Sequence, residues 1–362
     1  MKKEYPLVEI DLEKIRNNID EMVVRCARHG ISVAGVVKAF NGIPQIMGLF
    51  GESGCTSIAS SRLEHLEEAR MAGIPGPYMA IRIPMLSEIE DLVRLADFSL
   101  QSDLTAILSI EKECLKQDKT HSIILMADLG DLREGFWDRK ELIAAALTVE
   151  NTMERVYLAG IGTNLGCYGS VCATPEKLAN LVDIAEDIEK AIGRELDIIS
   201  GGGSTSVPLV LNGTMPGRIN HLRIGEAICL SYDLDKLWGL DVGFMHQDAF
   251  TLKVEIVEIR NKPTYPVGEL FVDCFGNRGS YEDRGIRKRA IVALGKLDFA
   301  FDTSLIPRLE GVEIIGSSSD HLILDIEDVP IPLSVGDILE FDLVYASLLY
   351  LTSSRYVKIG CR

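Results

Sequence analysis

The chain has 362 residues, of which 47% are hydrophobic and 25% are charged, which is typical of a globular protein. Because single cores rarely grow so large, this length predicts two domains, or one barrel with an appended domain. The net charge of −17 argues against nucleic acid or an anionic membrane surface as a partner.

The N-terminus and the cysteines indicate the compartment, and the cysteines and histidines argue against a metal centre. We find no apolar export signal and no apolar run of the roughly 20 residues that a membrane span needs, so we expect a cytoplasmic protein. The eight cysteines are scattered without a Cys-x-x-Cys pair, which is typical of reduced thiols. The six histidines have no metal-ligand spacing, so no metal is expected.

From residue 31 to about residue 230, short apolar runs alternate with amphipathic helical segments. Nearly continuous apolar runs are typical of strands that are buried on both faces of a parallel sheet. Alternation of this kind predicts a TIM-type (β/α)8 barrel, with a doubly wound open sheet as the alternative. The predicted strands are residues 33–37, 56–59, 78–82, 98–101, 122–128, 156–163, 197–200 and 222–228.

Two of the intervening helices have clear start signals. Ser61-Arg-Leu-Glu64 has the pattern of a capping box, and Gly73 is expected to end the helix that follows it. Thr174-Pro175 predicts an N-cap with proline at the first helical position.

After Trp238 the pattern changes to β-type runs separated by Gly, Pro and Asn turns, with few helix signals. We therefore predict an α/β barrel over residues 1–245 and an all-β C-terminal domain over residues 246–362. The β-type runs are residues 251–260, 270–274, 289–294, 313–315, 321–326, 338–343 and 356–359.

Lys38 lies where the first apolar run meets the polar turn Ala39-Phe-Asn-Gly42. In a parallel barrel, the carboxyl end of a strand is where catalytic residues lie. A partly desolvated amine loses its proton more easily, as a Schiff-base lysine requires. The alternative is a strand-end lysine that extends into solvent.

Taken together with Lys38 and the C-terminal β domain, several stretches resemble the alanine racemase superfamily, whose members are fold-type III pyridoxal-phosphate enzymes. Within it, residues 126–130, 162–169, 286–291 and 318–325 resemble the alanine/ornithine racemase branch. The stretches that carry the superfamily resemblance are residues 8–18, Val36-Val-Lys-Ala39, residues 127–135, Arg223-Ile-Gly225 and residues 316–321.

The resemblance implies that Lys38 binds pyridoxal 5'-phosphate as an aldimine and then acts as the base on one face of the substrate. It further implies that Arg223 faces the pyridine ring. Because a guanidinium with a pKa above 12 keeps its proton, the ring would stay a weak electron sink, which suits racemisation. The alternative for Arg223 is a salt bridge to Glu226 or to another acidic residue of the barrel. Asn164 stands where alanine racemases have a histidine against the ring.

The phosphate of the cofactor needs backbone N–H donors. Gly203 and Ser204 end the triplet Gly201-Gly-Gly203-Ser204 after the seventh predicted strand, where barrels commonly bind phosphate. Gly225 and the Glu226 amide would add donors after the eighth strand. A plain turn is the alternative for the glycine triplet.

The resemblance implies that Arg133 lies near the substrate carboxylate or the base on the opposite face. That second base is a tyrosine in alanine racemases, but the matching segment here is Asp273-Cys274-Phe275-Gly276. Because a thiol has an ordinary pKa of about 8.5, Cys274 is the first candidate, with a buried strand thiol as the alternative. The further candidates are Asp273, Tyr281 and Tyr345.

These observations predict a cytoplasmic amino-acid racemase that forms a head-to-tail homodimer, with ornithine or another basic amino acid as the leading substrate. Alanine racemase is the second possibility. A pyridoxal-phosphate homeostasis protein would share the barrel but needs no β domain. A metal-assisted D-amino-acid aldolase or dehydratase would need a His/Cys ligand pair, for which the lone His321 is poor evidence.

Overall fold

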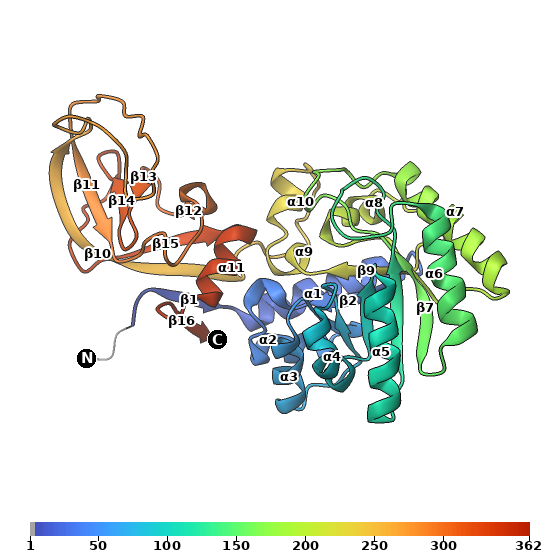
Figure 1. Cartoon of the computed structure of the whole chain (residues 1–362). Coiled ribbons are helices and arrows are strands. Elements are labelled where there is room, and N and C mark those ends of the chain that lie inside the picture. Colours follow the sequence, from blue (N-terminus) through green and yellow to red (C-terminus); the bar gives the residue numbers. More distant parts are fainter. Residues whose placement is uncertain (1–3) are drawn as a thin grey trace. The chain divides into compact units, whose positions relative to one another are not determined.

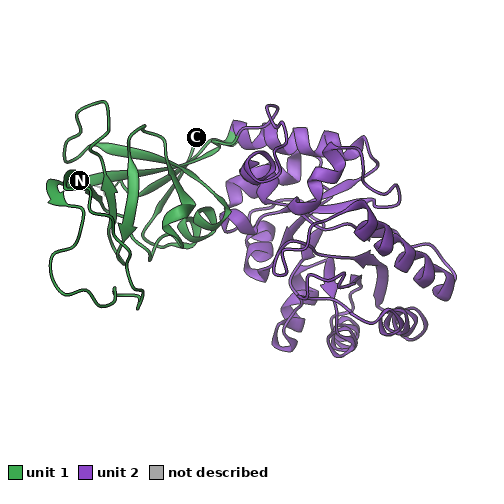
Figure 2. Cartoon of the chain, turned by 90° about the horizontal axis from the view of Figure 1, so that it is seen from above, with its two compact units in different colours: residues 1–12, 247–362 green, residues 13–246 purple. Residues whose placement is uncertain are grey.

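The computed structural model describes residues 4–362 and divides the chain into two compact units. One unit, purple in Figure 2, contains residues 13–246. The other, green in Figure 2, combines the N-terminal residues up to 12 with residues 247–362.

The unit of residues 13–246 is built on a closed parallel barrel whose last strand, β9, pairs with its first strand, β2. This confirms the predicted (β/α)8 barrel, and the open-sheet alternative is wrong. The last expected strand is shorter than predicted, because residues 226–229 turn into a short helix. The barrel strands are β2 (Ser32–Val36), β3 (Ser57–Ser60), β4 (Tyr78–Ala80), β5 (Phe98–Gln101), β6 (His121–Met126), β7 (Val156–Gly162), β8 (Ile198–Ser200) and β9 (His221–Ile224).

Apolar side chains fill the interior of the barrel, so it is a packed core and not a channel. The small residues Ala34 on β2 and Ala59 on β3 pack in one cluster with larger apolar residues of β4, β5 and β6. These larger residues are Met79, Leu100, Ile124 and Met126. This core fills the middle of the barrel, so the groups that could bind a ligand lie at the ends of the strands and in the loops that follow them.

Helices surround the barrel (Figure 1). The predicted cap at Thr174 is confirmed, since its hydroxyl accepts from the Lys177 amide. The capping box at Ser61 is wrong, because the helix begins one residue later, behind Arg62, without a side-chain cap. The helices are α1 (Leu12–Ala27), α2 (Pro44–Glu52), α3 (Leu63–Met71), α4 (Ile89–Leu95), α5 (Leu104–Gln117), α6 (Arg139–Thr152), α7 (Pro175–Ile192), α8 (Val207–Leu211), α9 (Glu226–Cys229) and α10 (Tyr232–Lys236), with 3₁₀ turns η1 (Lys38–Phe40), η2 (Leu86–Glu88) and η3 (Ser204–Ser206).

The second unit is a β sheet in which the neighbouring strands run in the order β12-β15-β10-β11-β14-β13. The long strand β10 pairs with β11 and β15 in antiparallel fashion and forms the centre of the sheet. The elements of this unit are β10 (Phe250–Pro263), β11 (Ile286–Val292), η4 (Asp302–Ser304), β12 (Leu305–Pro307), β13 (Glu313–Ser317), β14 (Leu322–Asp325), β15 (Ile338–Leu343), α11 (Tyr345–Ser353) and β16 (Lys358–Cys361).

Three expectations for this unit need correction. Strand β1 (Leu7–Ile10) pairs with β10 and β16, so residues 4–12 belong to the β unit and not to the barrel. Residues 270–274 form an exposed loop instead of a strand, because no neighbouring strand pairs with them. Helix α11 interrupts the all-β pattern; its N-cap residue, Val344, has no polar side chain that would signal a helix start.

Within residues 4–362, we find no helix with both the length and the apolar character that crossing a bilayer requires.

Candidate active site

The candidate active site is built at the carboxyl end of the barrel, where catalytic loops of parallel barrels lie. Lys38 opens the turn η1, two residues after the end of β2. Arg223 lies on β9, and Asn164 follows β7 by two residues. Gly203 and Ser204 follow β8, and Gly225 with Glu226 follows β9. The structure therefore brings most of the sequence-predicted residues to one end of one barrel.

Lys38 is half-buried, and its surroundings favour the neutral amine. Burial is the largest cause of a lowered Lys38 pKa, and the cations Arg133 and Arg223 lower it further. The charge of Glu134 acts in the opposite direction without reversing the shift. The neutral form of a lysine is the nucleophile, so this environment prepares Lys38 for covalent attachment of a carbonyl compound.

The turn that carries Lys38 is tied to its surroundings through a buried histidine. His65 on α3 lies with Nδ1 2.9 Å from the Ser60 hydroxyl and Nε2 3.1 Å from the Asn41 side-chain oxygen. Burial lowers the pKa of His65, so the imidazole stays neutral and bridges both groups. Gly42 has a φ of +65°, and a Cβ there would lie 2.7 Å from the His65 ring. Sequence reasoning missed His65, whose packing against the Asn41-Gly42 turn is a tertiary contact.

Arg223 is buried and is held by groups of two neighbouring strands. Its Nη2 donates to the carbonyl oxygen of Thr163 at 2.7 Å, and its Nη1 donates to the Ser200 hydroxyl. Burial lowers the Arg223 pKa to about 10, so the side chain remains cationic at neutral pH. Among the ion pairs of the described residues, none joins Arg223 to Glu226, so that alternative is not supported.

The segments after β8 and β9 form a cradle of backbone N–H groups. Within residues 4–362, no protein acceptor is found for the N–H groups of Gly203, Ser204 and Glu226. The Ser204 hydroxyl accepts from the Gly225 amide at 3.4 Å and from the Ala227 amide at 3.1 Å. Its own proton therefore remains available to an anion. This arrangement suits a phosphate group.

Two glycines allow the cradle to close. A Cβ on Gly203 would lie 2.9 Å from the Arg223 carbonyl oxygen, and a Cβ on Gly225 would lie 2.9 Å from the Val36 carbonyl oxygen. Both contacts are shorter than a side chain tolerates. The backbone therefore approaches β9 and β2 closely only because these positions are glycine.

Asn164 carries a buried donor that is available to a ligand. Its side-chain nitrogen is buried and has no hydrogen-bond partner within the part of the chain that the structure describes. A buried polar group without a partner costs free energy, so a bound group that accepts from it would be stabilised.

The loop after Asn164 is anchored by Asp131. This buried carboxylate accepts from the backbone amides of Gly166, Cys167, Tyr168 and Val171, at 2.9, 3.3, 3.0 and 3.4 Å. Burial alone would raise the Asp131 pKa, but these four donors outweigh it and the pKa lies below its usual range. The anchored loop holds the exposed thiol of Cys167 at the same end of the barrel as Lys38. Asp131 and Cys167 are site residues that the sequence analysis did not identify.

Arg133 is placed near Lys38 by the loop after β6. Its guanidinium forms a two-point ion pair with the adjacent carboxylate of Glu134. The hydrogen bonds to Glu134 raise the Arg133 pKa, so the side chain stays charged. Its charge in turn lowers the pKa of Lys38. Glu134 was not identified from the sequence, although it immediately follows Arg133 in the motif.

The Glu226 carboxyl group is buried next to the cradle. One of its oxygens, Oε1, has no hydrogen-bond partner within the described residues. Burial, reinforced by the charge of Asp233, raises the Glu226 pKa to about 8. The sequence analysis expected only a backbone donor here, but the structure adds a side chain that is mostly protonated at neutral pH.

The candidates for the second base all belong to the β unit. Cys274 is exposed in the loop that links β10 to β11, so the alternative of a buried strand thiol is wrong. Asp273 accepts from the amides of Phe275 and Asn277 at 2.9 and 2.8 Å, and these bonds hold its pKa below the usual range. Tyr281 is exposed on the same loop, and Tyr345 begins α11.

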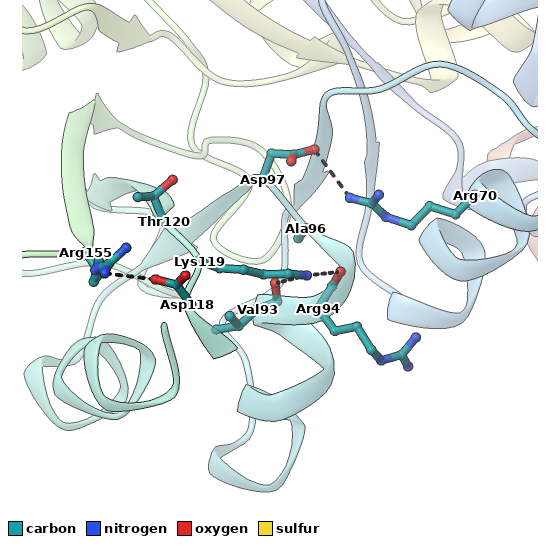
Figure 3. Close-up of a pocket in the computed structure, with 9 residues that line it drawn as sticks. All are labelled: Arg70, Val93, Arg94, Ala96, Asp97, Asp118, Lys119, Thr120 and Arg155. Atoms are coloured by element: carbon teal, nitrogen blue, oxygen red, sulfur yellow. Dashed lines mark hydrogen bonds and ion pairs between the residues drawn. The ribbon is translucent and has the colours of Figure 1, made fainter. Parts of the chain in front are cut away.

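A cavity of about 440 Å³ lies at the opposite end of the barrel, near the amino ends of β5, β6 and β7 (Figure 3). Its charged groups satisfy one another: Arg155 pairs with Asp118 at 2.9 Å, and Lys119 donates to the carbonyls of Val93 and Arg94. With its cations already paired, this cavity is a weaker ligand site than the Lys38 end. Throughout residues 4–362, no group of three or more His, Cys, Asp or Glu side chains is placed to hold a metal ion.

The barrel with a desolvated lysine, a buried arginine and an N–H cradle at one end defines a pyridoxal-phosphate enzyme of the barrel class. The family described as alanine racemase, N-terminal domain, matches residues 10–233. The chain is 40% identical to an ornithine racemase from Acetoanaerobium sticklandii over 98% of this chain and 99% of the relative. It is 37% identical to a lysine racemase from Thermotoga maritima over 98% of both chains. The chain therefore belongs to the alanine racemase family, whose cofactor is pyridoxal phosphate.

Solved structures show the same fold over the whole chain. An alanine racemase from Clostridium difficile superposes with a TM-score of 0.74 at 18% identity and covers 100% of this chain and 97% of its own. A D-threonine aldolase from Filomicrobium marinum has a TM-score of 0.74 at 16% identity, covering 96% of this chain and 88% of its own. At such low identity these structures establish the fold only.

Proposed function

We propose that this protein is a pyridoxal-phosphate-dependent racemase of basic amino acids, with ornithine as the leading substrate. The observation that carries the proposal is the similarity to an ornithine racemase and a lysine racemase over nearly the whole chain, both units included. Both names describe an amino acid with a second amino group in its side chain. Alanine is the second candidate, since ordinary alanine racemases share only the fold at this identity.

The residues at the carboxyl end of the barrel fit pyridoxal phosphate. Lys38 would attach it covalently, and the N–H groups of Gly203, Ser204 and Glu226 would bind its phosphate. The buried side-chain nitrogen of Asn164 supplies an unused donor, and Arg223 supplies a fixed cation. When bound, pyridoxal phosphate withdraws electrons from the Cα of an attached amino acid and acidifies the Cα proton.

Lys38 would remove or return that proton on one face of Cα, because its amine has a lowered pKa. Arg223 keeps its own proton at neutral pH, since its pKa of about 10 remains well above 7. Because Arg223 would donate no proton to the pyridine ring, the ring would accept less of the negative charge that develops at Cα. This favours prompt return of a proton to Cα over transamination. Arg133 would bind the substrate carboxylate near Lys38.

The opposite face needs a second proton donor, and we place it on the β unit of a partner subunit in a head-to-tail homodimer. The loop between β10 and β11 supports this proposal, because it exposes several large apolar side chains together with Cys274. Exposed apolar groups of this kind mark interaction surfaces. They are Tyr265, Val267, Leu270, Phe271, Val272, Phe275 and Tyr281.

A cytoplasmic location is part of the same proposal and rests on the reduced state expected of the scattered cysteines. A pyridoxal-phosphate homeostasis role explains the barrel but leaves residues 247–362 without a purpose.

The test is incubation of the purified protein, loaded with pyridoxal phosphate, with single L-amino acids in deuterium oxide. Cα deuteration and chirality are then read by NMR and chiral chromatography. We expect L-ornithine and L-lysine to racemise with higher kcat/KM than L-alanine. Activity confined to alanine would refute the basic-substrate proposal, and exchange with no amino acid would refute the racemase proposal.

A further inference from the structure

The loop that carries Arg133 and Glu134 is fixed against the end of β6. The Phe136 amide donates to the Met126 carbonyl at 2.7 Å, and the Asp128 amide donates to the Phe136 carbonyl at 3.0 Å. The Asp128 side chain also accepts from the Gly130 and Leu132 amides at 2.8 and 3.1 Å. Because both ends and the middle of the loop are held, it presents its charged side chains in a defined place.

Glu134 is the carboxylate in this loop that remains for a ligand. Asp128 is committed to the amides within the loop, and Asp131 is committed to the four amides of the loop after β7. Of the carboxylates among residues 4–362, Glu134 has the largest electrostatic effect on Lys38, and its charge also acts on Arg223. Glu134 therefore supplies a negative charge that acts on both Lys38 and Arg223.

A substrate with a second ammonium group needs such a carboxylate. Without Glu134, a cationic side chain that enters this end of the barrel would meet the guanidinium groups of Arg133 and Arg223 and would be repelled. A carboxylate offers about four lone-pair positions, of which the two-point pair with Arg133 uses two. Glu134 can therefore accept from an ammonium group while it remains paired with Arg133.

We propose that Glu134 binds the side-chain ammonium group of the substrate and thereby selects basic amino acids. The inference rests on the proposed function and adds the residue that determines its specificity. Arg133 and Glu134 would act as one unit, with the guanidinium directed to the α-carboxylate and the Glu134 carboxylate to the distal ammonium.

The test compares Glu134→Gln with wild type on L-ornithine and on L-norvaline, which has the same number of side-chain carbons as ornithine but no second ammonium. Glutamine keeps the shape and an acceptor oxygen but removes the charge. The matched control is Glu88→Gln, since Glu88 also pairs with an arginine near the carboxyl end of a barrel strand. Arg82, which follows β4, donates from Nη2 to both Glu88 carboxylate oxygens at 2.5 and 2.7 Å. Glu134→Asp keeps the charge and guards against a folding defect.

We expect Glu134→Gln to lower the ratio of kcat/KM for ornithine to that for norvaline at least about tenfold, mainly through KM of ornithine. Glu134→Asp should keep more of the ratio, and Glu88→Gln should leave it unchanged. An unchanged ratio would overturn the inference. If the ratio is unchanged because kcat/KM falls equally on both substrates, Glu134 only holds Arg133.

The wild-type protein separates this inference from the proposed function. If wild type racemises neither ornithine nor lysine, the proposed function is wrong and Glu134 has no substrate ammonium group to select. If wild type racemises ornithine and Glu134→Gln keeps the full preference, only the role of Glu134 is wrong.

Discussion

Arg223 donates a 2.7 Å hydrogen bond from Nη2 to the carbonyl oxygen of Thr163, the residue that follows β7. Together with its bond to Ser200, this contact links β9 to the ends of β7 and β8. The guanidinium is therefore fixed in a buried position, and its charge acts from a defined place on any group bound at Lys38.

Replacing Arg223 by Glu should slow racemisation by about tenfold or more and raise the share of transamination. A carboxylate there can share a proton with a pyridine nitrogen, whereas a guanidinium keeps its proton and cannot. The measurement is the ratio of keto acid to D-enantiomer formed from the L-amino acid. Arg223→Lys, which keeps a cation, is the control and should not raise that ratio. An unchanged ratio in Arg223→Glu, with a thermal unfolding curve like that of Arg223→Lys, would show that Arg223 does not face the ring.

Lys38→Ala should lose racemisation by at least about 10³-fold, because the cofactor would lack its covalent attachment and one face of Cα its base. Borohydride reduction followed by peptide mass analysis should place the cofactor on the Lys38 peptide of wild type and nowhere in Lys38→Ala. The exposed Lys140 supplies the control, as Lys140→Ala should keep both activity and labelling. Full activity in Lys38→Ala would refute the assignment of this site.

Glu226 should make the protein less stable as the pH rises. Its pKa is raised by burial, and by Asp233, from 4.5 to about 8, so the folded state holds a proton that the unfolded chain releases. Between these two values the free energy of unfolding falls with rising pH, and the contribution is lost as pH passes through about 8. The free energy of unfolding of Glu226→Gln should therefore exceed that of wild type by about 4 kcal/mol at pH 8 and match it near pH 4.5. Denaturant unfolding at both pH values measures this difference. A difference in the free energy of unfolding that is the same at pH 4.5 and pH 8 would contradict the prediction.

Cys274→Ala should abolish racemisation while cofactor binding persists, because an exposed thiol is accessible for proton exchange. Deuterium exchange at Cα should survive for one enantiomer only, since Lys38 still serves its own face. Cys172→Ala is the matched control, because Cys172 is also exposed. Normal racemisation by Cys274→Ala would redirect the search to Tyr281 and Tyr345, as Asp273 is held ionised by backbone amides.

Subunit mixing tests the proposed homodimer. Equal amounts of Lys38→Ala and Cys274→Ala should recover about a quarter of wild-type activity after exchange, because half of the dimers are mixed and each has one intact site. Each variant alone supplies the baseline. Activity per subunit of wild type should also fall on dilution below the dimer dissociation constant. A monomer that stays fully active would refute the arrangement.

Local sequence signals predicted much of the barrel. The apolar runs placed β5 at Phe98–Gln101 without error and the other barrel strands within a few residues, since burial on both faces leaves a direct trace in the sequence. Lys38 was recognisable because it lies at the point where the apolar strand ends and the polar turn begins. The strand at Leu7–Ile10 was missed, because its partners β10 and β16 lie more than 200 residues away in the chain.

The sequence by itself determined the order of strands and helices, the lysine at the end of β2 and the glycines of the cradle, because each depends on neighbours along the chain. Only the tertiary structure decided which charges meet. The bond from Arg223 to Thr163 and the anchoring of residues 166–171 by Asp131 both join separate segments at the carboxyl end of the barrel. Barrel closure through β9 and β2 brings those loops together, and no local pattern records it.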